Sequence, residues 1–181
     1  MCIRDRFIIE ENKRLKKIID DYVAESEEVV AKIIIDKNSP FLRSLIINKG
    51  SKNNIKLGMA VLDKNYLIGK VVEVNYLTSR ILLLSDLNSK IPVIIEPGGF
   101  QSILSGTGKM EGTLQYLKEN YLIEGKNTVY TSGAGGLFKA GIPIGRIEKS
   151  EPDEENKVNF FSDFSQMRFV KIKSFKKEES N

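Results

Sequence analysis

The chain has 181 residues, of which 28 are basic and 24 acidic, so its net charge is +4, and 41% of its residues are hydrophobic. This content suffices for one domain or two small ones, and the mild, dispersed charge indicates neither a nucleic acid nor an anionic membrane as partner. The sequence contains no histidine and one cysteine, Cys2. Because the usual general base, internal disulfides and thiolate zinc clusters are excluded, we expect no catalytic residue, no metal and no cofactor.

The first residues do not resemble the start of a natural protein. Residues 1–6, MCIRDR, fit nothing that follows, and no secretory signal precedes the charged segment that begins at Phe7. The longest apolar runs, such as Ile81-Leu82-Leu83-Leu84, are the size of strands, whereas roughly 20 residues are needed to span a bilayer. We expect a non-native start and a truncated N-terminus.

Residues 7–30 are expected to form a helix with coiled-coil character. This segment contains neither Gly nor Pro, and apolar residues recur at every seventh position. The alternative is an amphipathic helix that lies on its own domain, because Asn12, Glu25 and Ser26 interrupt the second seam position. The heptad pattern predicts a dimer seam made of Ile8, Leu15, Tyr22 and Val29.

After residue 30 the hydrophobic period changes to two and β-branched residues dominate, which predicts strands separated by polar turns. Frequent turn signals favour a barrel or sandwich, and the lack of long helical segments disfavours a parallel α/β sheet. We expect a mainly β fold in which the N-terminal coiled-coil helix precedes two small barrel-like or sandwich-like modules, at 31–96 and 97–175, and a charged tail at 176–181. The expected strands are 29–35, 42–48, 59–62, 67–74, 80–84, 91–95, 102–104, 113–117, 128–131, 143–148, 158–161 and 168–173.

A sequence pattern that occurs twice supports two similar modules. Val61 precedes the run Leu67-Ile68-Gly69-Lys70-Val71, as Val129 precedes Pro143-Ile144-Gly145-Arg146-Ile147. A Pro-Gly-Gly break at 97–99 is either the boundary between the modules or a hairpin loop. Whether the second module is appended to the first or inserted in it stays open. Two similar β modules favour a binding scaffold over an enzyme.

Residues 131–147 hold five glycines among apolar residues and no side chain suited to catalysis. Their Gly-Ala-Gly-Gly stretch lacks the last glycine of a dinucleotide fingerprint, so turns with left-handed residues are the better interpretation. Leu137 and Phe138 are expected to form an exposed tip that contacts a partner; the alternative is that Phe138 plugs its own barrel. Structural turns are expected at Gly58, Gly69, Gly133, Gly136, Gly141 and Gly145.

Basic residues interspersed with aromatic ones define an alternative function. Lys70, Arg146 and Arg168 stand near Tyr66 and Phe169, as an oligonucleotide-binding barrel requires. The solvent faces of half-buried strands give the same pattern, and no aromatic cluster stands out. A cell-wall hydrolase is a third hypothesis, which the missing histidine and the lack of paired acids disfavour.

Several apolar and glycine-containing segments follow one another in a characteristic order, namely Ser39-Pro40-Phe41, 45–50, Gly58-Met59-Ala60-Val61, 67–74, Thr78-Ser79-Arg80, 82–84 with Asp86, 131–141 and 143–147. Together with the heptad stripe, they resemble the rod shape-determining MreC family over residues 7–172. The Thr-Ser-Gly segment at Thr131 is specific to that family. The chain departs from the family at three places. Asn54 stands where the family shows glycine, Lys139 stands where it shows proline, and the turn at 125–128 is longer than the family's turn. These departures affect loops only.

The resemblance implies a non-enzymatic scaffold that maintains rod shape by organising peptidoglycan synthases of the bacterial cell-elongation machinery. It implies a single-pass inner-membrane protein whose transmembrane helix is missing from this chain, with the present portion in the periplasm. It also implies self-association into a homodimer or higher oligomer. The other implied partners are MreD, the actin-like MreB, an elongation-specific penicillin-binding transpeptidase and its glycosyltransferase. The resemblance implies no nucleic-acid partner.

Overall fold

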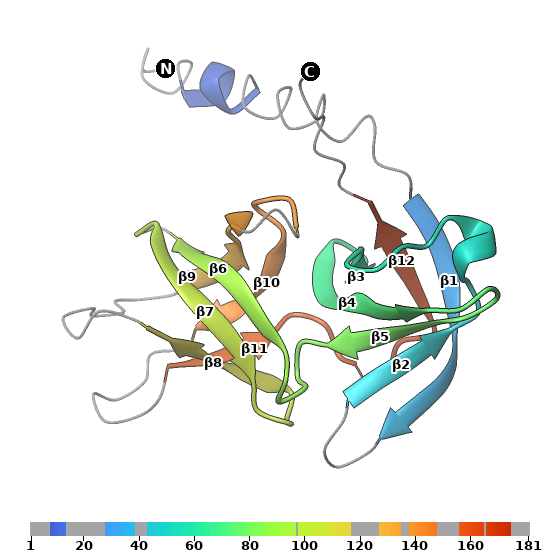
Figure 1. Ribbon diagram of the computed structural model, residues 1–181. Helices are drawn as coiled ribbons and strands as arrows, with labels where there is room; N and C mark the ends of the chain where they lie inside the picture. Colours follow the sequence, from blue (N-terminus) through green and yellow to red (C-terminus); the bar gives the residue numbers. More distant parts are fainter. Residues whose placement is uncertain are drawn as a thin grey trace.

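The computed structural model describes residues 8–13, 28–38, 43–96, 98–116, 127–134, 138–147, 156–164 and 166–174. In these ranges the strands form two closed six-stranded barrels that stand side by side (Figure 1). The first barrel has the strand order β1-β12-β3-β4-β5-β2, made of β1 (Glu28–Asn38), β2 (Arg43–Ile47), β3 (Ala60–Asp63), β4 (Tyr66–Val74), β5 (Ser79–Leu83) and β12 (Phe169–Lys173). The second has the order β10-β11-β8-β7-β6-β9, made of β6 (Lys90–Glu96), β7 (Phe100–Gly106), β8 (Glu111–Gln115), β9 (Asn127–Thr131), β10 (Pro143–Ile147) and β11 (Lys157–Phe160).

The prediction of a mainly β chain with two barrel-like modules is confirmed, and each of the twelve strands overlaps an expected one. Successive side chains of a strand point to opposite faces, so every second residue fills the barrel. β6 shows this alternation, since Ile91, Val93 and Ile95 are buried while Lys90 and Glu96 at its ends are exposed. A short 3-10 turn, η1 (Ser51–Asn53), precedes β3.

The second barrel is inserted into the first. β12 lies between β1 and β3, where Lys171 stands opposite Val30 on one side and Leu62 on the other. β6 pairs with β7 and β9 and therefore belongs to the second barrel. The expected boundaries 31–96 and 97–175 need correction, because the last strand closes the first barrel and the second barrel runs from β6 to β11. Alternation is a local signal and does not say which distant strand is the partner.

The Pro-Gly-Gly break is a hairpin loop and not a boundary. β6 and β7 pair in register from Lys90 opposite Ser105 to Ile95 opposite Phe100. Between them, the Gly99 N–H donates a hydrogen bond to the carbonyl oxygen of Ile95 over 2.8 Å. Of the two interpretations that the sequence left open, the hairpin therefore holds.

The N-terminal part differs from the expected helix at its C-terminal end. Residues 8–13 are helical, but β1 begins at Glu28, so the expected range of 7–30 is too long. Val29, expected in the dimer seam, instead pairs with Ile172 and packs against the core of the first barrel. Its β-branched neighbours favour strand over helix. Leu15 and Tyr22 lie outside the described residues, so the coiled coil and its seam stay a prediction.

Three of the expected turn glycines have left-handed backbone. The φ angles are 83° at Gly58, 74° at Gly133 and 89° at Gly141, a region that glycine enters without steric cost. Asn54, where the family shows glycine, also adopts a left-handed backbone with φ 62°, which asparagine enters more easily than most residues. Gly136 lies outside the described residues.

Gly69 and Gly145, in contrast, are not turn residues, which corrects the expectation. They lie inside β4 and β10, and neither has a positive φ. A Cβ atom at Gly69 would clash with the carbonyl oxygen of Leu82, and one at Gly145 with that of Asn159. Glycine is required here because a neighbouring backbone approaches closely.

The connection from the first barrel to the second is buried at both of its ends. Ser85, Asp86 and Ser89 are almost inaccessible to solvent. The Gly108 N–H donates to the Ser85 carbonyl over 2.8 Å, and the Asp86 carboxylate accepts the N–H of Asn88 over 2.7 Å. Asp86 thus caps local backbone, as aspartate commonly does in turns. The inserted barrel therefore joins the first through a fixed segment.

Thr131, at the start of the glycine-rich segment, ties the two ends of that segment together. Its buried hydroxyl donates to the carbonyl oxygen of Lys139 over 2.5 Å and accepts the N–H of Ile142 over 3.0 Å. Its own N–H donates to the Ile142 carbonyl, and its carbonyl accepts the N–H of Gly141, each over 2.9 Å. One side chain therefore fixes how the segment returns to β10.

We expect Thr131→Val to lower the free energy of unfolding by about 1–3 kcal/mol, because the N–H of Ile142 loses its buried hydroxyl acceptor. Urea unfolding followed by circular dichroism measures the change. Thr128→Val on the same strand is the matched control, since Thr128 is only half-buried. Equal effects of the two substitutions would contradict the role of the Thr131 hydroxyl.

Candidate protein-binding surface

Phe138, one of the two residues that the sequence proposed for partner contact, is not an exposed tip. It is 5% exposed and belongs to the hydrophobic core, which agrees with the alternative interpretation that its side chain packs inward. Leu137 lies outside the described residues. Of the proposed seam, Ile8 is exposed on the helical residues 8–13.

The described residues contain no group of three or more His, Cys, Asp or Glu side chains that would hold a metal ion. Within the same ranges, we find no helix with the length and hydropathy that crossing a lipid bilayer requires.

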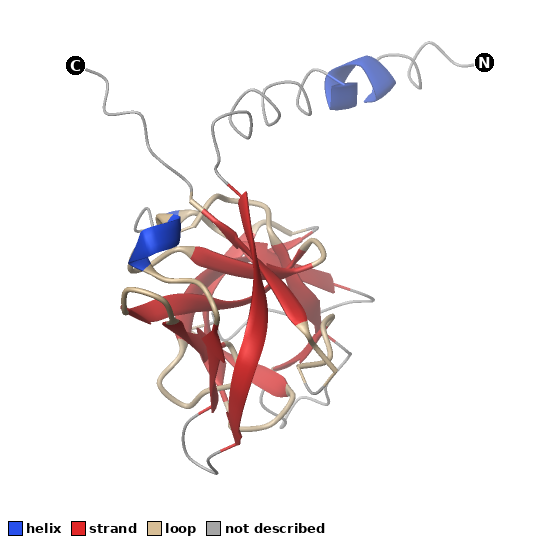
Figure 2. Cartoon of the chain, turned by 90° about the vertical axis from the view of Figure 1, so that its right-hand side faces the viewer, coloured by secondary structure: helices blue, strands red, loops and turns tan. Residues whose placement is uncertain are grey.

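An apolar surface occupies the outer side of the first barrel, where β1 pairs with β12. We call it the β1–β12 face, defined by Val30, Lys32, Ile34, Phe169 and Lys171. Val30, Ile34 and Phe169 are 55%, 51% and 57% exposed, although their strands also supply the core. Val30 stands opposite Lys171, and Lys32 opposite Phe169. Each apolar side chain of these two pairs therefore has a lysine as its cross-strand neighbour. Figure 2 views the molecule from the side of the first barrel.

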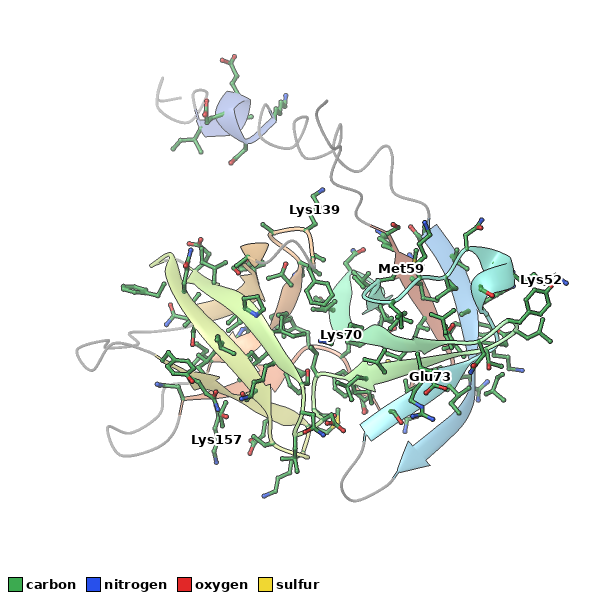
Figure 3. All side chains as sticks on the ribbon, viewed as in Figure 1. Lys52, Met59, Lys70, Glu73, Lys139 and Lys157 are labelled. Atoms are coloured by element: carbon green, nitrogen blue, oxygen red, sulfur yellow. The ribbon has the colours of Figure 1, made fainter. Side chains whose placement is uncertain are left out.

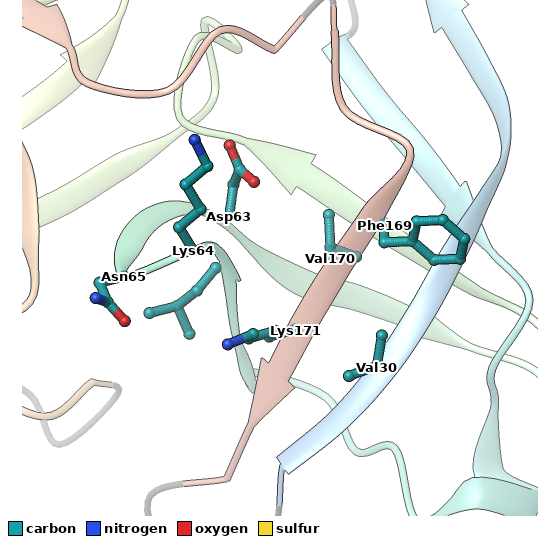
Figure 4. Close-up of a pocket in the computed structure, with 8 residues that line it drawn as sticks. Val30, Asp63, Lys64, Asn65, Phe169, Val170 and Lys171 are labelled. Atoms are coloured by element: carbon teal, nitrogen blue, oxygen red, sulfur yellow. The ribbon is translucent and has the colours of Figure 1, made fainter.

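A groove of about 370 Å³ adjoins this face (Figure 4). β12 with Val30 forms one wall, and the turn between β3 and β4 forms the other, with Asp63, Lys64 and Asn65. Lys64 adopts φ 57°, a backbone conformation that is uncommon for residues other than glycine. The β1–β12 face and the groove thus form one continuous candidate surface.

The charges on this surface are unevenly paired. Lys171 and Lys173 share Glu28, at 3.4 and 3.6 Å. Among the described residues, Lys32 and Lys64 have no carboxylate within salt-bridge distance. On the second barrel, by comparison, Lys157 lies 3.9 Å from a carboxylate oxygen of Glu111 (Figure 3). The surface therefore offers two uncompensated cations beside its apolar side chains.

Two of the residues that suggested nucleic-acid binding, Tyr66 and Arg146, contact Phe161 within the chain. The rings of Tyr66 and Phe161 lie 5.0 Å apart, and the Arg146 guanidinium lies 5.8 Å from the centre of the Phe161 ring. Arg80 pairs with Glu73 at 3.2 Å. Tyr66 is thus engaged within the chain, whereas Phe169 is exposed, so this alternative keeps one free aromatic face from the pair that suggested it.

The same aromatic pair joins the two barrels. Tyr66 begins β4 of the first barrel, while Phe161 follows β11 of the second and donates its N–H to the Ile144 carbonyl. β4 and β10 are also in contact across the junction. These are the strands that carry the repeated sequence pattern, so the junction brings the two copies together.

We expect Tyr66 and Phe161 to be energetically coupled by about 0.5–1.5 kcal/mol, the usual range for an aromatic pair. A double-mutant cycle of Tyr66→Ala and Phe161→Ala, read by urea unfolding, measures the coupling. Phe160→Ala is the matched control, because the Phe160 ring stacks on Phe164 at 5.4 Å. Additive effects of Tyr66→Ala and Phe161→Ala would contradict a stabilising contact between the barrels.

A family model described as rod shape-determining protein MreC, barrel core, matches residues 33–174. This range covers both barrels except the first residues of β1. The chain belongs to the MreC family. A cell shape-determining protein MreC from Cereibacter sphaeroides is 32% identical over 144 residues, which are 80% of this chain and 48% of that protein. The chain thus spans about half the length of this relative.

Solved structures of family members have the same fold. The crystal structure of MreC from Pseudomonas aeruginosa is 29% identical, with a TM-score of 0.73 over 81% of this chain and 98% of that one. A complex between Penicillin-Binding Protein (PBP2) and MreC from Helicobacter pylori contains a chain that is 17% identical, with a TM-score of 0.65 over 84% of this chain and 100% of that one. At this identity the likeness shows the fold alone. The family that the sequence indicated is confirmed.

The sequence interpretation missed Val30 and Ile34 as surface residues. Both stand in runs of consecutive β-branched residues, where alternation between a buried and a solvent face is hidden. Such a run on a barrel strand must expose part of its apolar side chains. Consecutive β-branched residues are therefore the signal that would have identified Val30 and Ile34 as surface residues.

Proposed function

We propose that this chain is the two-barrel portion of a scaffold that organises peptidoglycan synthases and so maintains rod shape. One observation carries the proposal: the barrel core of a cell shape-determining family matches residues 33–174, and this range covers both barrels. The complex of a Helicobacter pylori MreC with PBP2 supports a penicillin-binding transpeptidase as the partner. The described residues contain no metal-binding cluster, which is compatible with a non-enzymatic role.

The finer features of the proposal come from the family resemblance. They are a periplasmic location with an anchor in the inner membrane, self-association through the N-terminal seam, and MreD, MreB and a glycosyltransferase as further partners. The exposure of Ile8 supports the seam, because a side chain that is apolar and exposed in one chain is available to a second chain.

The proposal is tested by binding of the periplasmic part of an elongation-specific penicillin-binding transpeptidase from the source organism. With the chain immobilised, we expect saturable binding, and none to an unrelated periplasmic protein of similar charge. A folded chain that fails to bind the transpeptidase but binds single-stranded DNA with a steep salt dependence would overturn the proposal in favour of an oligonucleotide-binding barrel.

The non-enzymatic part of the proposal has a separate test. We expect no cleared band when the chain is run in a gel that contains purified peptidoglycan. A cleared band that depends on the refolded chain would identify a hydrolase instead.

A further inference from the structure

We propose that the β1–β12 face and its groove dock a polypeptide segment that presents a carboxylate between two apolar side chains. The proposal rests on the scaffold function, since it names the chemistry of one partner contact. Its evidence is the combination of exposed apolar side chains, unpaired lysines and a concave neighbour on the same side of the first barrel.

Apolar side chains flank a lysine along β1. Val30 and Lys32 are alternate residues of the strand, so their side chains leave the same face. Ile34 follows at the bulge where the register between β1 and β2 shifts, and its side chain is exposed as well. The two apolar members are each more than half exposed, and Phe169 on β12 stands opposite the lysine between them. A partner segment laid along β1 therefore meets an apolar side chain, a cation and a second apolar side chain in turn.

The unpaired lysines of the surface determine which charge such a partner must carry. Lys32 has no acidic neighbour within salt-bridge distance in the described chain, and Lys64 on the far wall of the groove has none either. A cation that is covered by an apolar contact without a counter-charge loses solvation at a cost. A carboxylate opposite Lys32 removes this cost and sets the register of the partner, because a basic group there is repelled.

The shape and the acids of the surface favour a polypeptide over a lipid bilayer. The groove between β12 and the β3–β4 turn is concave, with Leu62 in its lining, and it admits a side chain but not a flat membrane. Asp63 lines the groove, and Glu28 is paired with Lys171 and Lys173 at the edge of the face. The Asp63 carboxylate repels an anionic headgroup that enters the groove, whereas a polypeptide can place its carboxylate opposite Lys32 and away from Asp63.

The experiment uses the full chain and a fluorescein-labelled peptide built from repeated leucine-threonine-glutamate-threonine units, read by fluorescence anisotropy. In an extended conformation this peptide presents leucine and glutamate alternately on one side. We expect it to bind, and a peptide with lysine in place of glutamate to bind at least about tenfold more weakly, because opposite charges at an interface select the partner. Phe169→Ser and Lys32→Glu are each expected to weaken binding of the acidic peptide about tenfold, as for a central contact.

Matched substitutions on the second barrel provide the controls. Tyr116→Ser removes an exposed aromatic residue, and Lys109→Glu reverses an exposed cation. Neither is expected to change the affinity, and thermal unfolding verifies that all four variants are folded.

Three results would overturn the proposal: equal binding of the acidic and basic peptides, an unchanged affinity of a folded Phe169→Ser chain, or no peptide binding with Phe169-dependent binding to phosphatidylglycerol vesicles. The last result would assign the surface to a lipid. Each is distinct from a failure of the scaffold function, which is read from binding of the transpeptidase to the unaltered chain.

Discussion

A chain that ends at Gln166 is expected to lose the first barrel and to keep the second. The deletion removes β12, whose backbone pairs with both β1 and β3, and with it the buried side chains of Val170 and Ile172. Burial of each such side chain contributes about 1.5–3 kcal/mol, which is a large part of the stability of a small domain. The opened barrel also exposes two unpaired strand edges, so we expect aggregation.

Amide hydrogen exchange read by mass spectrometry measures the outcome for each barrel separately. We expect protection to vanish in β3 to β5 and to persist in β6 to β11, because the second barrel is complete without β12. A chain that ends at Ser174 is the control, since it retains every pair of β12. If β3 to β5 of the shorter chain remained protected, strand β12 would not be required for the first barrel to fold.

Gly145→Ala is expected to destabilise the second barrel by about 3 kcal/mol or more, at the upper end of the cost of overpacking a core. The added methyl group would clash with the carbonyl oxygen of Asn159 and with the side chain of Val158. Both belong to the adjacent strand β11, which cannot move away without breaking its pairs with β8 and β10. Urea unfolding and hydrogen exchange in β10 measure the loss.

Gly99→Ala is the matched control for this substitution. Gly99 lies in the β6–β7 loop with φ 69°, and no heavy atom lies within 4 Å of an added Cβ. We therefore expect only the cost of a left-handed alanine, about 1 kcal/mol. A cost at Gly145 that did not exceed the cost at Gly99 would show that β10 and β11 adjust to the added methyl group.

Most of the fold was predictable because strand formation here is a local property. Alternating burial along β6, and β-branched residues throughout, located all twelve strands to within a few residues. Pairing was not predictable, because β12 is separated in sequence from its neighbours by the whole inserted barrel. The end of the N-terminal helix was misplaced for a related reason, since the heptad position of Val29 also suits a strand that begins at Glu28.

The candidate surface was harder to predict than the fold. The sequence singled out Phe138 because glycines flank it, but flanking glycines allow an aromatic side chain to turn inward as readily as outward, and here it is buried. Gly69 and Gly145 were assigned to turns because sequence does not distinguish a positive φ from a close backbone approach. For Phe169 the sequence predicted only base stacking. Its neighbours on β1 come from the opposite end of the chain, so the sequence did not indicate that they share a surface.

The insertion also determines how the molecule would respond to mechanical load. The chain enters the first barrel at Glu28 and leaves it at Lys173, and these two residues are partners at the same end of adjacent antiparallel strands. Tension between them would pull β1 and β12 apart one residue pair at a time, starting at this pair. The second barrel, which lies entirely between β5 and β12 in sequence, would carry no force until the first had opened.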